Sequence, residues 1–74
     1  MATCVTLYTR AGCHLCEDAE ALLRRLGYDV TPVDVDADRG LQARYGDEVP
    51  VLAVNGRVVL SGIIREQAVR KALD

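Results

Sequence analysis

The chain has 74 residues, half of them apolar, and a formal net charge of −2 at pH 7. This length fits one domain covering residues 1–74, with a small core that must be aliphatic because Phe and Trp are absent. The chain has no basic run interleaved with aromatic residues, and no apolar stretch near the roughly 18 residues of a membrane span, so we expect neither nucleic-acid nor membrane binding.

The N-terminal third predicts a strand, a loop and a helix. Residues 3–8 are β-branched or apolar on both alternate faces, which indicates a buried strand in which Cys4 acts as a small hydrophobe. Across residues 13–26 the apolar side chains recur at helical spacing, and Cys16 shares their face. Gly27 follows the last of them and suits a left-handed helix end.

The middle of the chain predicts an edge strand and a short helix. Residues 28–35 alternate apolar and polar side chains, and Pro32 within them favours a position at a sheet edge. Asp36 and Asp38 are candidate caps for a short helix that ends at Gly46.

A hairpin and a last helix complete the chain. Residues 51–54 and 57–61 flank Asn55-Gly56, a dipeptide typical of a type I′ turn, and residues 64–73 carry an amphipathic helical stripe. The predicted order is therefore β-α-β-α-β-β-α. Since a helix joins the first two strands, we expect them to be parallel, in an α/β fold with a four-stranded mixed sheet flanked by three helices.

Two cysteines stand at the junction of the first strand and first helix, as Cys13-His14-Leu15-Cys16. A sulfur at a helix N-terminus meets unpaired N–H groups and the positive end of the helix dipole, which favour a thiolate. The thiolate is the nucleophile of disulfide exchange. A Cys13–Cys16 disulfide would close only a tiny loop and add little stability, so we interpret the pair as reactive, with Cys13 attacking and Cys16 resolving.

Two stretches of the sequence resemble the glutaredoxins. Residues 8–16 (YTRAGCHLC) are similar to the glutaredoxin segment that leads into its Cys-x-x-Cys, and Glu48-Val49-Pro50 falls where that family has Thr-Val-Pro with a cis proline. The Cys-His-Leu-Cys variant resembles a small bacterial glutaredoxin-like group. The resemblance implies a thioredoxin-like fold and a role as a glutaredoxin-like protein-disulfide reductase and electron carrier in cell redox homeostasis.

The resemblance also implies substrate-binding residues around the cysteines. Arg10 takes the place of a family Lys and would add positive charge or receive a substrate carboxylate, although a solvated loop Arg is as good a reading. His14 would add charge beside Cys13 or simply be solvated. With Pro50 cis, the backbone of Val49 would be free to pair with substrate like an added strand. The alternative is that Pro50 is simply a proline tolerated as the first residue of a strand.

The segment before the last helix bears on the electron donor. Glutaredoxins usually carry Gly-Gly followed closely by Asp, used for glutathione, whereas this chain has Ser61-Gly62-Ile63-Ile64. Ser61-Gly62 followed by Arg65-Glu66 is more similar to the small NrdH-type redoxins, which thioredoxin reductase reduces. We therefore expect no bound cofactor, with glutathione as a possible but poor reductant and a reductase as the alternative donor.

Two other functions use the same residues. A metal-binding module of the copper-chaperone kind also places Cys-x-x-Cys between a first strand and a first helix, and would bind through Cys13 and Cys16. That fold ends in a strand, however, whereas this chain ends in a predicted helix. A redox-inert interaction domain that kept the fold is the third reading.

Cysteine usage predicts the compartment. Three cysteines make an odd count, which argues against a secreted disulfide framework, and the N-terminus has no signal-peptide pattern. We expect a cytoplasmic monomer whose partners are disulfide-bearing proteins or small thiols.

Overall fold

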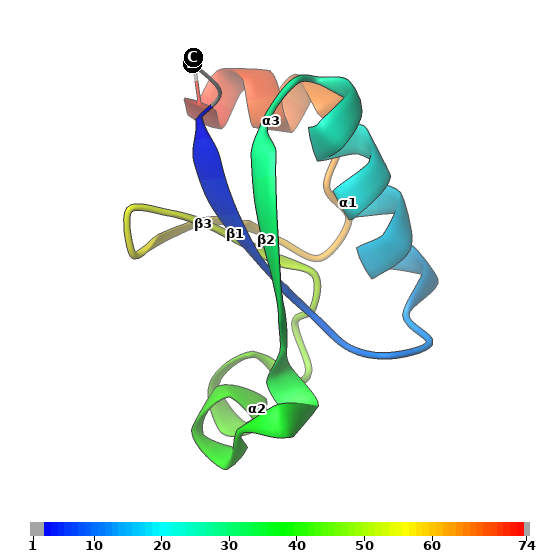
Figure 1. Ribbon diagram of the computed structural model, residues 1–74, viewed down its shortest axis with the longest axis vertical. Helices are drawn as coiled ribbons and strands as arrows, with labels where there is room; N and C mark the ends of the chain where they lie inside the picture. The colour runs from blue at the N-terminus through cyan, green and yellow to red at the C-terminus, as the bar shows by residue number, and fades with distance from the viewer. Residues whose placement is uncertain (1–2, 74) are drawn as a thin grey trace.

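The computed structural model describes residues 3–73 (Figure 1). In chain order the elements are β1 (Cys4–Thr9), α1 (His14–Arg25), β2 (Asp29–Asp34), the 3₁₀ turn η1 (Val35–Ala37), α2 (Arg39–Tyr45), β3 (Val51–Val54), β4 (Arg57–Ser61) and α3 (Glu66–Leu73). Apart from η1, this is the predicted order of strands and helices.

The strands form one mixed sheet in the order β2-β1-β3-β4. β1 and β2 are parallel because α1 carries the chain back across the sheet, while β1–β3 and β3–β4 are antiparallel. β2 lies at an edge of the sheet, where Pro32 costs no hydrogen bond to a second neighbouring strand. The predicted fold class is confirmed.

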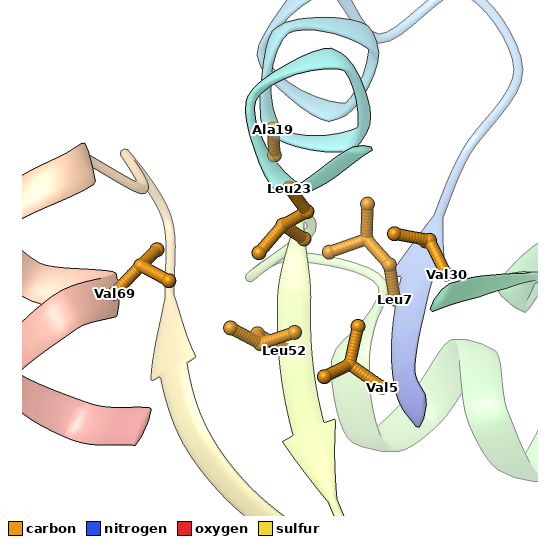
Figure 2. Close-up of a cluster of buried hydrophobic side chains, with 7 residues drawn as sticks. All are labelled: Val5, Leu7, Ala19, Leu23, Val30, Leu52 and Val69. Carbon is orange, nitrogen blue, oxygen red and sulfur yellow. The ribbon is translucent and has the colours of Figure 1, made fainter. Parts of the chain in front are cut away.

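An aliphatic core holds α1 and α3 against one face of the sheet (Figure 2). Its buried members are Val5, Leu7, Ala19, Leu23, Val30, Leu52 and Val69. α2 is attached to the other face. Side chains alternate across a strand, so Tyr8 points away from its neighbour Leu7, and its ring stacks on Tyr45 of α2 with centroids 4.5 Å apart.

The expectation that Cys4 is buried is wrong. In β1 the side chains of Val5 and Leu7 are buried, whereas Cys4 is exposed and its Sγ lies 3.6 Å from a carboxylate oxygen of Asp29. The helix on the same face of the sheet as Cys4 is α2, and it lies near the end of β2 and far from the start of β1 (Figure 1). The first residue of β1 therefore has no helix above it.

The hairpin and the short helix differ little from expectation. Asn55 and Gly56 have φ angles of 53° and 78°, as a type I′ turn requires. Asp38 caps α2 by accepting the N–H groups of Gly40 and Leu41 at 2.7 and 3.2 Å. Asp36 is not a cap, contrary to prediction, because its carboxylate accepts hydrogen bonds from the side chains of Arg10 and Gln42 instead.

The last helix begins later than predicted. α3 starts at Glu66 rather than at Ile64, and its first turn closes when the N–H of Val69 donates to the carbonyl of Arg65 at 3.0 Å. Ile64 still packs against the core from the preceding segment. Among residues 3–73, no helix has the length and apolar character needed to cross a bilayer.

Candidate active site

The candidate active site begins at the turn between β1 and α1. Gly12 has a φ of 78°, in the left-handed region that favours glycine, and the N–H of Cys13 donates to the carbonyl of Arg10 at 3.2 Å. Cys13 is the N-cap of α1, and its Sγ accepts the N–H of Cys16 at 3.2 Å. The sulfur thus occupies the place where a capping oxygen usually stands.

Cys16 lies in the first turn of α1 and differs sharply from Cys13. Its side chain is only 3% exposed, on the face it shares with Ala19 and Leu23, whereas Cys13 is half-buried. Burial, followed by contact with Cys13, raises the pKa of the Cys16 thiol to about 11. At neutral pH Cys16 is therefore a protonated thiol.

Arg10 is tied to an acidic partner outside the Cys-x-x-Cys turn. Its Nε lies 3.0 and 3.2 Å from the two carboxylate oxygens of Asp36, and its Nη2 lies 3.1 Å from one of them. The hydrogen bonds to Asp36 and its charge raise the pKa of Arg10 above its ordinary value. Arg10 is therefore held in place by the first residues after β2.

His14 lies in solvent. Its side chain is 95% exposed and its Nδ1 is 3.5 Å from a carboxylate oxygen of Glu17, one helical turn further on. Of the two expectations for His14, this position is closer to a solvated imidazole than to a charge directed at Cys13.

A second group of predicted residues lies around the start of β3. The Val49–Pro50 peptide bond is cis, as the resemblance implied. The N–H of Gly62 donates to the carbonyls of both Glu48 and Pro50, at 3.2 and 2.9 Å, and Ser61 is paired with Val51. Within residues 3–73 these bonds leave the N–H and C=O of Val49 without a backbone partner.

The sheet topology brings the two groups to the same end of the molecule. Tyr8 near the end of β1 is paired with Val51 at the start of β3, because these strands are antiparallel. The turn that holds Arg10 and Cys13 follows the end of β1, and Pro50 directly precedes the start of β3. The predicted site residues therefore gather around these strand ends, with His14 directed outward.

Sequence reasoning missed Asp36 as part of this site. β1 and β2 are parallel, with Thr9 paired with Asp34, so the residues that follow the two strands emerge side by side. A basic residue after one strand and acidic residues after the other are the signal that could have paired Arg10 with Asp36. No group of three or more His, Cys, Asp or Glu side chains within residues 3–73 is arranged to hold a metal ion.

Comparisons with known proteins point in the same direction as this geometry. The profile of the glutaredoxin-like domain family (DUF836) matches residues 4–74. Uncharacterized proteins of Mycobacterium bovis and Mycobacterium tuberculosis are 40% identical over 62 residues, which cover 72% of this chain and 64% of theirs. The chain thus spans less than two thirds of the length of these relatives.

Solved structures share the fold. The X-ray structure of the target protein XcR50 from X. campestris matches with a TM-score of 0.85 and 36% identity over 95% of each chain. The glutaredoxin of Archaeoglobus fulgidus matches with a TM-score of 0.69 and 20% identity, over 99% of this chain and 87% of that one. The chain has a thioredoxin-like fold.

Proposed function

Since the chain belongs to the glutaredoxin-like domain family, we propose that it is a thiol–disulfide oxidoreductase that works through a Cys13–Cys16 dithiol. The observation that carries the proposal is the asymmetry of the two sulfurs. Cys13 caps α1 and is partly accessible, whereas Cys16 is 3% exposed with its pKa raised to about 11. An accessible nucleophile and a protected second thiol are what two-step exchange requires.

In the first step the Cys13 thiolate attacks one sulfur of a substrate disulfide. A bond forms between Cys13 Sγ and that sulfur, the substrate S–S bond breaks, and the other substrate sulfur leaves as a thiolate that takes a proton from water. The N–H of Cys16, 3.2 Å from Cys13 Sγ, and the N-terminus of α1 favour the negative charge before attack.

In the second step Cys16 releases the product. Its thiol loses a proton and attacks Cys13 Sγ, and the remaining substrate sulfur leaves and is protonated. The substrate has then gained two electrons and two protons, and the protein holds a Cys13–Cys16 disulfide that a thiol donor must reduce. The high pKa of Cys16 keeps it out of reaction until this step.

The roles of the two sulfurs can be separated by trapping. Reduced Cys16→Ser, mixed with 2-hydroxyethyl disulfide, should accumulate an adduct on Cys13, because release needs the second thiol. Cys13→Ser should form no such adduct at the site, and wild type should pass through to the intramolecular disulfide. Intact and peptide mass spectrometry measure all three.

Cys4→Ser is the matched control for trapping. It removes an exposed thiol at the start of β1, outside the candidate site, and should behave as wild type. A Cys16→Ser protein modified mainly at Cys4 would contradict the assignment of Cys13 as the nucleophile.

The surroundings of the cysteines favour a protein substrate. The unpaired N–H and C=O of Val49 suit an extended peptide that adds like a strand. Leu15 and Ile63 are 45% and 63% exposed, so apolar side chains are accessible on the segments next to Cys16 and Gly62. We propose a monomer that acts on disulfide-bearing proteins in a reducing compartment such as the cytoplasm, with a reductase as donor.

Glutathione is proposed to be a poor partner because its ammonium lacks an acidic group to bind. Ile63 and Ile64 stand before α3 and offer no carboxylate. The next acidic residue, Glu66, is already paired with Arg25 and Arg70, with N–O distances of 3.1 Å for each. Losing a charge-assisted hydrogen bond costs on the order of 1.5–3 kcal/mol, or roughly one to two powers of ten in affinity.

This proposal is checked by exchange equilibria on Cys16→Ser. The mixed disulfide of Cys13 with glutathione should be no more stable, within about threefold, than that with β-mercaptoethanol, since few specific contacts are expected. The Glu66→Gln variant is the control for a contribution from that carboxylate. A strong preference for glutathione that is lost in Glu66→Gln would show that Glu66 binds the ammonium.

A further inference from the structure

Arg10 connects the candidate active site to a part of the chain that the proposed exchange reaction does not use. Its carbonyl accepts the N–H of Cys13 at 3.2 Å, while its guanidinium forms a two-pronged ion pair with Asp36 of η1 at 3.0–3.2 Å. Burial raises the pKa of the Cys16 thiol, and the backbone and charge of Arg10 act in the opposite direction. One residue therefore links the cysteine turn to η1 through both its backbone and its side chain.

Asp36 is itself fixed from two sides. Its N–H donates to a carboxylate oxygen of Asp34 at 2.9 Å, which holds the 3₁₀ turn, and its Oδ1 accepts Nε2 of Gln42 in α2 at 3.1 Å. The contacts with η1 and α2 thus fix the position of the carboxylate independently of Arg10.

The guanidinium of Arg10 lies beside Gly46, where the absence of a side chain leaves room for it. Gly46 at the end of α2 is buried, and a Cβ at this position would be 2.9 Å from Arg10 Nη2 and 2.5 Å from the carbonyl oxygen of Gln42. The acidic groups that act on Arg10 are Asp36, Asp47 and Asp34. Arg10 therefore lies against α2, and Asp36 is the acidic group that acts on it most strongly.

We propose that Asp36 is a positioning residue that fixes the guanidinium of Arg10, the residue whose carbonyl accepts the N–H of Cys13, and, by offsetting its charge, sets the redox potential of the Cys13–Cys16 pair. This inference rests on the proposed thiol–disulfide exchange. The reaction concerned is protein disulfide plus dithiothreitol dithiol giving protein dithiol plus cyclic oxidised dithiothreitol, a transfer of two electrons and two protons.

The two members of the ion pair act on this equilibrium in opposite directions. A thiolate in the reduced pair carries charge and the disulfide does not, so added positive charge favours the reduced form. Asp36→Asn unmasks Arg10 and should raise the equilibrium constant for reduction threefold to tenfold, a tenfold change being about 30 mV for two electrons. Arg10→Gln should lower it by a similar factor.

The experiment titrates each oxidised protein with dithiothreitol buffers at about 0.15 M salt and counts free thiols after alkylation. It is run at pH 6 and at pH 9, since only the ionised part of the reduced pair responds to charge, and the effect should be larger at pH 9. A merely structural role for the ion pair would not give opposite signs for the two variants, nor this pH profile.

Three further variants sharpen the comparison. Asp36→Glu keeps the charge and should stay within twofold of wild type. The double variant Arg10→Gln/Asp36→Asn should fall between the two single variants. Glu66→Gln makes the same charge change in another arginine ion pair, with Arg25 at the C-terminal end of α1, about 18 Å along the helix from Cys13, and should also stay within twofold.

Opposite shifts of the two single variants support the inference. Equal equilibrium constants within twofold, or shifts in the same direction, overturn it while leaving the exchange function intact. If Asp36→Asn does not fold, as judged by circular dichroism, the direction of Arg10→Gln alone decides. A wild-type protein that forms no Cys13–Cys16 disulfide would contradict the proposed function itself, and this inference with it.

Discussion

Burial of Cys16 makes the stability of the reduced protein depend on pH. Its pKa is raised from 9.0 to about 11 in the folded state, so folding favours the protonated thiol. This contribution is fully present below pH 9 and is lost as the pH rises toward 11, with an upper limit of about 3 kcal/mol. Urea unfolding of reduced wild type and Cys16→Ala measures this between pH 7 and 11. Above pH 9, the free energy of unfolding of wild type should fall relative to that of Cys16→Ala.

The oxidised protein is the control for this prediction. Its Cys16 has no proton to lose, so the same pH range should show no such change for oxidised wild type relative to the variant. A difference between reduced wild type and Cys16→Ala that is constant up to pH 11 would mean that water reaches the Cys16 sulfur freely.

Elements with strong local signals were predictable from the sequence. Asn55-Gly56 has the backbone preferences of its turn built in, and both hairpin strands have the predicted bounds. The start of α3 was placed too early at Ile64. Ile64 packs against the core, so in the sequence it continues the helical spacing of the apolar residues in α3. The backbone before Glu66 is nevertheless not helical.

Contacts between elements were less predictable, and they decide the candidate site. The pattern in residues 13–26 correctly put Cys16 on the buried face, because helical spacing alone determines that. The pairing of Arg10 with Asp36 depends instead on the parallel register of β1 with β2. The exposure of Cys4 depends on how far α2 extends along the sheet. Both are properties of the assembled sheet, which a local sequence pattern does not contain.

The whole molecule depends on a small core shared by α1, the sheet and α3 (Figure 2). Leu52 in β3 has no exposed surface and lies in the cluster that joins Leu23 of α1 to Val69 of α3. Leu52→Ala should lower the free energy of unfolding by about 2–5 kcal/mol. Against a total of about 5–15 kcal/mol, that is a large share of the stability of a domain of this size.

The same variant tests whether the candidate site and the core unfold together. Because Cys16 belongs to the buried face of α1, its reaction with a thiol reagent in urea should share its midpoint with the loss of circular dichroism, in wild type and in Leu52→Ala alike. Val58→Ala, at a position 45% exposed, is the matched control and should move the midpoint little. If Cys16 became reactive well below the circular dichroism midpoint, the first turns of α1 would open as a separate unit. The protection of the resolving thiol would then be local to α1 and would not come from the core that Leu52 supports.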